Sequence, residues 1–291
     1  MAVGAALLAL GAFAQSGQAP KREGVVLTLD GPVTPANAGY LEREISAAST
    51  AGKEIILVEI DTPGGLVDAM HTIVKAIRAS ETPVVTYVYP EGARSASAGL
   101  YIMYAAHVSA MAPSTNTGAA TPVNLGGDDS EPAPKAPTPD KPAEEPKAAP
   151  ATPVEPSGAE KAGEAAREGL ENVRPSATDQ PSGPLSNDDA LRAKQINDSV
   201  AYIRALAEAT GRNADWAEQA VREAVSVSAN EALRLGVIDV VATNTDDLLA
   251  KIDGRKVKTA SGERVLKTKD LALTRVEPTL VERILGFIAN P

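Results

Sequence analysis

Two serines separated by one alanine stand among small residues in the segment GARSASAG, residues 92–99. The residues after Ser97 predict a helix, so its hydroxyl lies at a helix N-terminus, where backbone N–H groups stabilise negative charge. The small neighbours of Ser97 also allow a substrate backbone to come close. Because a serine at a helix start is more often an N-cap than a nucleophile, this segment alone leaves the roles of Ser95 and Ser97 open.

A second segment that is suited to chemistry is DTPGGL, residues 61–66, which follows an apolar run. Its Pro-Gly-Gly turn joins a predicted strand to a predicted helix and exposes backbone N–H groups at the helix N-terminus. Such groups can hold the negative charge that develops on a tetrahedral intermediate. A tight strand-to-helix turn without any function is the alternative interpretation of this segment on its own.

Alternating strands and helices are predicted around both segments. The predicted strands span residues 25–29, 55–60, 83–88 and 108–111, and the predicted helices span residues 35–50, 66–79 and 97–106. This alternation is typical of βαβ units, so we expect an α/β fold with a mainly parallel sheet. Both turns then lie at the carboxyl edge of one sheet, where α/β proteins place their ligands.

Polar residues predict where three of the helices begin. Thr34 stands before Pro35, a favourable pair for an N-cap and a first helical residue. Asn213 follows Gly211 and predicts the cap of a further helix. Ser228 and Glu231 have the spacing of a capping box, in which each side chain bonds the backbone N–H of the other residue.

The composition changes sharply over residues 126–186, which are rich in Pro, Ala, Glu and Lys and contain few large apolar residues. Such a segment cannot bury enough apolar surface to offset chain entropy, so we expect a long disordered Pro/Ala/Glu-rich insertion. It divides the expected domain into residues 24–125 and 187–255. A β-rich part follows over residues 256–291, and we expect its amphipathic end to lead toward a membrane segment.

Residues 1–23 predict a secretory signal peptide followed by a linker. The apolar run over residues 2–14 ends in the small-x-small pattern AFA, which suits signal cleavage. A short buried helix or an apolar tail is the alternative interpretation. With a signal peptide, we expect an exported protein that acts in the periplasm or at the extracytoplasmic face of the membrane.

Charge and composition argue against several functional classes. The chain has 28 Lys and Arg against 38 Asp and Glu, a net charge of −10, which disfavours nucleic acid as a partner. It contains no cysteine, which excludes disulfides, thiolate metal sites and a cysteine nucleophile. Its two histidines are far apart in the sequence and do not suggest a catalytic zinc site. We therefore expect neither a metal nor a cofactor.

Three segments resemble one enzyme family in their order and spacing: DTPGGL at residues 61–66, GARSASAG at 92–99 and AMAPSTNTG at 110–118. They look like the serine peptidases of the ClpP/crotonase fold, and in particular the NfeD-type membrane-bound serine proteases of the ClpP class. The resemblance covers about residues 24–122 and 188–291. It implies a ClpP/crotonase-like fold built from repeated β-β-α and βαβ units.

The resemblance also implies roles for individual residues. The family's nucleophile corresponds to Ser97, so Ser95 lies in the approach to the turn. The donors of the oxyanion hole correspond to the turn of Gly64 and Gly65, with Gly65 preferred, and to the backbone N–H of Ala98.

The base that accepts the serine proton is not evident from the residues alone. His71 lies in a predicted helix but off its apolar stripe, and His107 follows a helix C-terminus, where positive charge is favourable. We expect a structural or surface role for both histidines and therefore no Ser-His-Asp triad. The NfeD-type branch resembles Ser–Lys dyad enzymes, and its lysine corresponds to Lys194 in the segment KQINDSVAYI.

A lysine accepts a proton only when it is neutral, and its reference pKa of about 10.4 opposes this at pH 7. Burial lowers such a pKa by up to about 3–5 units, and a bound apolar substrate would complete this burial. If the insertion holds Lys194 away from Ser97, the dyad forms only when a substrate binds. The alternative for Lys194 is a surface position. We expect Lys53 to be solvated, and four further lysines lie in the expected insertion: Lys135, Lys141, Lys147 and Lys161.

The resemblance implies a serine endopeptidase that cleaves apolar segments of a membrane-associated partner, with the C-terminal region of a stomatin-like protein as the expected substrate. It also implies a homo-oligomer. A non-catalytic scaffold with the same fold and partner is the first alternative. An acyl-CoA enzyme of the crotonase superfamily is the second, although that chemistry requires neither Ser97 nor Lys194.

Overall fold

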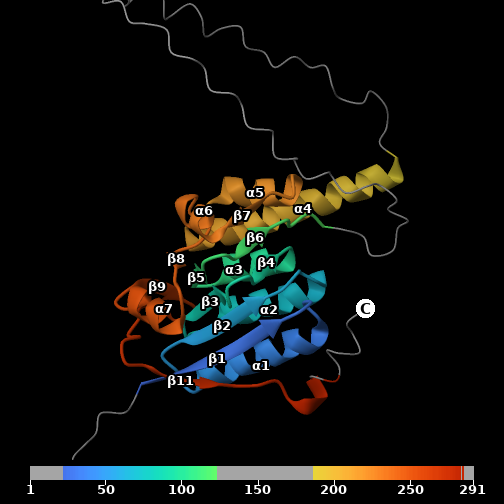
Figure 1. The fold of residues 1–291 in the computed structure, drawn as a ribbon. Helices are drawn as coiled ribbons and strands as arrows, with labels where there is room; N and C mark the ends of the chain where they lie inside the picture. The colour runs from blue at the N-terminus through green and yellow to red at the C-terminus, as the bar shows by residue number, and fades with distance from the viewer. Residues whose placement is uncertain (1–21, 123–185, 283, 285–291) are drawn as a thin grey trace, which may run out of the picture. The chain divides into compact units, whose positions relative to one another are not determined.

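A six-stranded parallel sheet in the order β11-β1-β2-β3-β5-β8 forms the centre of the domain (Figure 1). The computed structural model describes residues 22–122, 186–282 and 284. The strands are β1 (Glu23–Asp30), β2 (Ile56–Asp61), β3 (Val84–Val88), β5 (Val108–Met111), β8 (Val240–Val241) and β11 (Ala272–Arg275). The predicted α/β fold with a mainly parallel sheet is confirmed. The predicted insertion lies outside the described residues apart from Ser186, and the predicted signal segment and linker lie outside them apart from residues 22 and 23.

Alternate residues of the central strands face two separate apolar cores. Leu27 and Leu29 of β1 belong to one core, whereas Val26 belongs to the other. In β2, Val58 and Leu57 divide in the same way. Every residue of β3 and β5 is buried, which is the composition expected of parallel strands covered on both faces.

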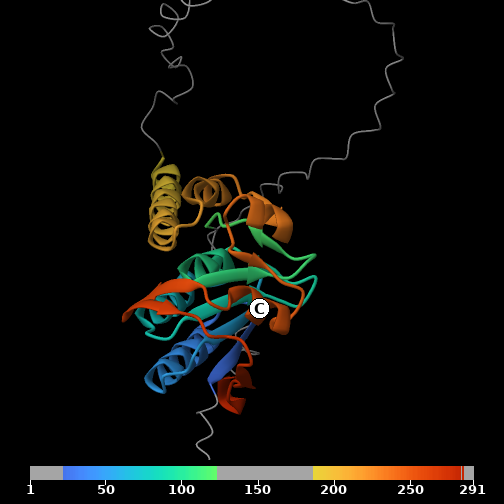
Figure 2. The ribbon, with the colours of Figure 1, turned by 90° about the vertical axis from the view of Figure 1, so that its left-hand side faces the viewer.

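Helices and a hairpin cover the two faces. Residues of α1 (Pro35–Thr50), α2 (Val67–Ala79) and α3 (Ala98–Ala105) contribute to the first core, with α4 (Asn187–Thr210) and α5 (Ala214–Arg222). The second core takes residues from α7 (Thr245–Ile252), β9 (Lys256–Thr259) and the segment after β10 (Gly262–Val265). Helices α1 and α2 lie side by side along the sheet (Figure 2). No described helix combines the length and the apolar composition that a membrane span requires.

The three residues predicted to cap helices all occupy N-cap positions, and two of them form cap hydrogen bonds. Thr34 and Asn37 form a reciprocal capping box with Pro35 as the first helical residue, and the Asn213 side chain accepts from the Trp216 N–H. The capping box of Ser228 and Glu231 is wrong, because the Ser228 side chain makes no cap bond to α6 (Ala229–Arg234). Ser228 is the N-cap residue of α6 and also ends a short strand, and the Glu231 carboxylate pairs with Arg234.

A second, smaller sheet was not predicted. It contains β4 (Arg94–Ala96), β6 (Asn116–Gly118) and β7 (Ser226–Ser228), in the order β4-β6-β7. The pairing of β4 with β6 is parallel, and that of β6 with β7 is antiparallel. The sheet therefore joins the residues before the insertion to those after it, and its first strand ends directly before Ser97.

Candidate active site

Ser97 occupies a strained backbone position between β4 and α3. Its φ of 52° and ψ of −118° lie in a region of backbone conformations that residues other than glycine rarely adopt. Its N–H donates to the Gly118 carbonyl of β6 at 2.9 Å, which holds the turn in place. A strained serine at a sharp strand-to-helix turn is the arrangement that exposes a nucleophilic Oγ in hydrolases. The backbone thus favours a chemical role for Ser97 over that of an ordinary N-cap, and its side chain makes no cap bond.

The Pro-Gly-Gly turn lies directly against Ser97. The Gly64 N–H donates to Thr62 Oγ1 at 3.1 Å, so Gly64 has no free donor for an oxyanion. Among the described residues, no acceptor is found for the Gly65 N–H, and Gly65 lines the same hollow as Ser97. Of the two predicted donors in this turn, the Gly65 N–H is therefore the one left free, whereas the Gly64 N–H is already bonded.

Ala98 supplies the other predicted donor. It is the first residue of α3, and the N–H groups of a first helical turn have no partner within the helix. Ala98 lines the hollow beside Ser97 and Gly65. The structure therefore brings together the predicted nucleophile and two backbone donors, one from each of the two segments that the sequence indicated.

A hollow in front of Ser97, here called the serine pocket, has walls from four parts of the chain. Its lining residues are Gly65, Val67, Met70, His71, Ser97, Ala98, Tyr101, Ala120, Pro122, Asp198, Ser199 and Tyr202. Most of these side chains are apolar or aromatic, and α4 contributes the polar residues Asp198 and Ser199. A polypeptide segment that lies in the serine pocket would contact α2, α3 and α4 together.

Ser95 is buried behind this site. It is 0% exposed, and the absent side chain of Gly99 makes room for it, since a Cβ there would lie 2.5 Å from Ser95 Oγ. The Ser95 Oγ has no hydrogen-bond partner among the described residues. A substrate cannot reach Ser95, so burial argues for Ser97 in the choice between the two serines.

Lys194 is not brought next to Ser97. It lies on the exposed N-terminal part of α4 and is not among the residues that line the serine pocket. Asp198, one turn further along α4, does line the pocket, and residues four apart share a helix face at a rise of about 6 Å. The role of Lys194 as the base therefore stays a prediction. Lys194 lies one helical turn of α4 away from Asp198, outside the pocket.

His71 lies in the serine pocket, which the sequence did not indicate. Its ring meets the Tyr202 ring edge-on, with 4.7 Å between the centroids. The position of His71 off the apolar stripe of α2 was visible in the sequence, but not that α4 covers this side of α2. His71 is thus the one imidazole near the predicted nucleophile in the described part of the chain.

His107 has a structural role. Its Nδ1 accepts a hydrogen bond from the Val84 N–H at 3.0 Å. Burial, together with the positive charges of Arg78 and Arg212, lowers the pKa of His107 to about 4. The expectation that positive charge is favourable at this helix C-terminus is therefore wrong for His107, because burial and two nearby guanidinium groups disfavour its charged form.

Tyr101 joins the walls of the pocket that come from α3 and α4. Its ring stacks on Tyr202 with centroids 6.0 Å apart, and its hydroxyl hydrogen-bonds the Ser199 side chain. Burial raises the pKa of Tyr101 to about 12, so its hydroxyl stays protonated at neutral pH. No group of three or more His, Asp or Glu residues that could hold a metal occurs within the described ranges.

Comparison with known families and proteins gives consistent matches. Residues 25–136 match the family described as NfeD1b, N-terminal domain. The membrane-bound protease PH1510 of Pyrococcus horikoshii is 31% identical over 270 residues, which are 91% of this chain and 48% of that protein. The membrane protein NfeD1b of Bacillus subtilis is 34% identical over 122 residues, 42% of this chain and 27% of that protein. The chain thus spans about half the length, or less, of these curated relatives.

Solved structures of one protease share the fold. A lysine-to-alanine variant of the 1510-N membrane-bound stomatin-specific protease, in complex with a substrate peptide, has a TM-score of 0.67 and 30% identity. The match covers 92% of this chain and 98% of that one. A serine-to-alanine variant of the same protease has a TM-score of 0.66 and 31% identity over 89% of this chain and 99% of the other.

Proposed function

This chain belongs to the NfeD-type membrane-bound proteases of the ClpP class, and we propose that it is a serine endopeptidase with Ser97 as its nucleophile. The family relationship confirms the resemblance that three short segments indicated. The observation that carries the proposal is the strained backbone of Ser97, which presents its hydroxyl in a pocket together with the Gly65 and Ala98 N–H groups.

The proposed reaction proceeds through an acyl-enzyme. Ser97 Oγ attacks the carbonyl carbon of the scissile peptide bond, and its proton passes to the base. The Gly65 and Ala98 N–H groups donate to the carbonyl oxygen as it becomes an oxyanion. The conjugate acid of the base then protonates the leaving amine, and a water molecule hydrolyses the ester on Ser97.

We propose that Lys194 is the base and that Ser97 and Lys194 come together as a dyad only when a substrate binds. Lys194 is exposed on α4, one turn from Asp198 in the serine pocket. A polypeptide bound across this end of α4 would cover Lys194 and remove water from its amine, which favours the neutral form. The relative's solved variants replace a serine and a lysine, the same pair of residue types.

We further propose that the substrate is an apolar segment of a stomatin-like protein. Leu66 and Val67 are 44% and 56% exposed at the start of α2, where the serine pocket begins. Exposed apolar side chains beside a nucleophile suit an apolar substrate. The 1510-N protease is described as stomatin-specific, which supports the same partner class here. An extracytoplasmic position at the membrane and a homo-oligomeric state are part of this proposal.

Cleavage of a peptide from the C-terminal region of a stomatin-like protein tests the proposal. We expect cleavage by the unchanged chain and a loss of about a thousandfold or more in Ser97→Ala and in Lys194→Ala. Lys75→Ala, which removes an exposed lysine from α2, is the matched control and should keep full activity. Binding of the peptide without cleavage by the unchanged chain would favour the non-catalytic scaffold instead.

A further inference from the structure

A second hollow, far from Ser97 in the fold, has four cationic side chains among its nine lining residues. We call it the basic pocket and define it by Arg78, His107, Asp239, Arg255, Lys256 and Lys258. Arg78 lies in the last turn of α2, His107 directly before β5, and Asp239 directly before β8. These are the amino ends of the parallel strands, whereas Ser97 and the Gly64–Gly65 turn follow carboxyl ends. The two pockets share no residue.

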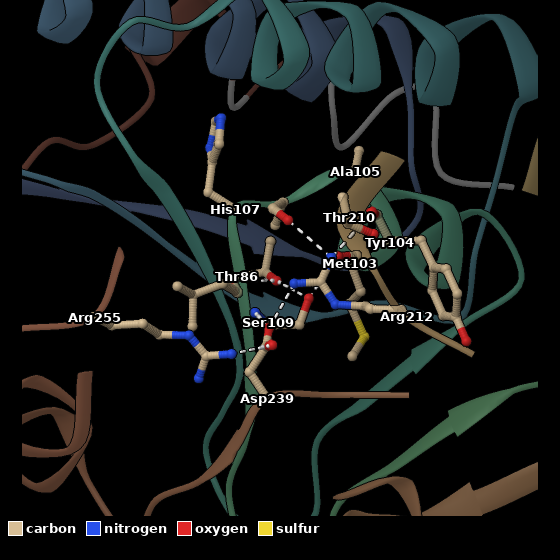
Figure 3. A network of polar contacts seen from close by, with 12 residues as sticks. Thr86, Met103, Tyr104, Ala105, His107, Ser109, Thr210, Arg212, Asp239 and Arg255 are labelled. Carbon is tan, nitrogen blue, oxygen red and sulfur yellow. Dashed lines mark hydrogen bonds and ion pairs between the residues drawn. The ribbon is translucent and has the colours of Figure 1, made fainter. Parts of the chain in front are cut away.

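The carboxylate of the basic pocket is already neutralised. Asp239 binds Arg212 at 2.6 Å and Arg255 at 2.5 Å, and the two guanidinium groups approach it from different sides (Figure 3). Asp239 also accepts from the Ser109 N–H at 2.8 Å. Two full positive charges therefore share one carboxylate, which leaves an excess of positive charge at this point.

Arg212 has a structural task that accounts for its own burial. Its side chain is 3% exposed, and its NH1 donates to the carbonyls of Tyr104 and Ala106 at the end of α3. The negative end of the α3 dipole compensates part of this charge. Arg212 therefore has a structural role beneath Asp239. The cations that a ligand can reach are the ones that line the pocket: Arg78, Arg255, Lys256 and Lys258.

The remaining cations of the basic pocket form no ion pair in the described part of the chain, although Glu263 lies opposite Lys258 in the pairing of β9 with β10. Arg78 is half-buried and donates only a long bond of 3.4 Å to the Ala105 carbonyl. Lys256 and Lys258 are exposed on the same side of β9, since their side chains are two residues apart in a strand. Within the described ranges, none of these three side chains forms an ion pair. These cations give the basic pocket a local positive charge within a chain of net charge −10, which favours an anion there.

We propose that the basic pocket binds a phosphoryl group. Guanidinium forks match the geometry of phosphate oxygens in pairs, and lysines add point charges, so Arg78, Arg255 and the two lysines suit a doubly charged tetrahedral anion. Arg255 keeps its bond to Asp239 and offers its remaining N–H groups. Burial lowers the pKa of His107, and the positive charges of Arg78 and Arg212 beside it lower the pKa further.

Two sources of a phosphoryl group fit this chemistry: a soluble phosphate compound or the headgroup of an anionic phospholipid. The basic pocket contains neither Ser97 nor any other residue that lines the serine pocket. A variant of the basic pocket should leave peptide cleavage unchanged, so failure of this proposal and failure of the proposed function are separate results.

The first test titrates inorganic phosphate and pyrophosphate into the full chain, with calorimetry and with NMR of the two imidazoles. We expect saturable binding that shifts the His107 signals and leaves those of His71 unchanged, with His71→Asn to assign them. The double variant Lys256→Gln/Lys258→Gln should bind about tenfold more weakly. Its matched control is Lys267→Gln/Lys269→Gln, which removes two exposed lysines with the same spacing outside the pocket.

Sedimentation with lipid vesicles distinguishes the two sources of the phosphoryl group. Vesicles that contain phosphatidylglycerol are compared with vesicles of phosphatidylcholine alone. A lipid source predicts sedimentation with the anionic vesicles, competed by pyrophosphate and weakened in the Lys256/Lys258 double variant. A soluble source predicts saturable phosphate binding without sedimentation. The proposal is overturned if neither phosphate nor pyrophosphate shifts the His107 signals, or if the two double variants bind these anions equally well.

Discussion

Gly64 packs so closely against Ser97 that a Cβ atom on Gly64 would lie 2.5 Å from Ser97 Cβ and 3.0 Å from Ser97 Oγ. The φ of Gly64, 110°, is also one that other residues rarely adopt. One glycine thus satisfies two requirements at once: the bend of the turn after β2 and the space for the serine side chain from the turn after β4. The two segments that the sequence indicated are in direct contact.

We expect Gly64→Ala to abolish this fit. The added methyl group would displace the Ser97 side chain, and a displacement of about 1 Å at a reacting atom costs about a hundredfold in rate. Peptide cleavage and thermal unfolding measure the two effects. Gly92→Ala is the control, because Gly92 has a φ of 87° but open space around its Cβ position. Equal losses of activity in the two variants would show that backbone strain alone is responsible.

The strain at Ser97 predicts a stability gain when the side chain is removed. Ser97→Gly should raise the free energy of unfolding by about 1–3 kcal/mol, the usual cost of such a backbone conformation, and should abolish cleavage. Urea denaturation of both proteins measures the difference. Ser114→Gly makes a parallel change at an exposed residue with a φ of 61° and should stabilise the protein without loss of activity. A destabilised Ser97→Gly variant would argue against stored strain.

The pH dependence of cleavage distinguishes the two candidate bases. A lysine base is active only when neutral, so kcat/KM should still rise between pH 7 and pH 10, whereas an imidazole base gives a plateau near neutral pH. His71 lines the serine pocket against Tyr202, so we expect His71→Gln to raise KM about threefold and to keep the shape of the pH profile. A plateau near neutral pH that disappears in His71→Gln would assign the base to His71.

His107 predicts a loss of stability in acid. Its pKa of about 4 in the folded protein is below the ordinary value of 6.5, so the unfolded chain binds more protons between these values. Stability contributed by neutral His107 is present above about pH 6.5 and decreases as the pH falls toward 4, by up to about 3 kcal/mol.

Urea unfolding between pH 4 and pH 8 measures this loss. His107→Asn keeps an acceptor for the Val84 N–H without an imidazole, so its stability should vary less over this range. His71→Asn is the control and should retain the acid-dependent loss. The same dependence in the unchanged chain and in His107→Asn would contradict the assignment.

The sequence by itself determined the parallel α/β architecture and the two segments that meet at the site. Apolar runs such as those of β2 and β3 report burial on both faces, and strands that alternate with helices leave few topologies. Because parallel strands share a carboxyl edge, the turns at Gly65 and Ser97 were expected to be neighbours at the edge of one sheet. They are neighbours, but the prediction of a single sheet is wrong, because Ser97 follows β4 of the smaller sheet. Local capping at Thr34 and Asn213 followed from side-chain chemistry within a few residues.

Only the tertiary structure decided which residues face one another across long separations. The strands β4, β6 and β7 have three residues each, too few for a hydrophobic period to predict them, and β7 pairs across the insertion. The packing of α4 against α2 placed His71 in the serine pocket, while Lys194 lies one turn outside it. The cations of the basic pocket come from α2, β9 and the residue before β9. A local pattern reports how each element is buried, but its partner depends on chain-wide packing and charge balance, which no short segment contains.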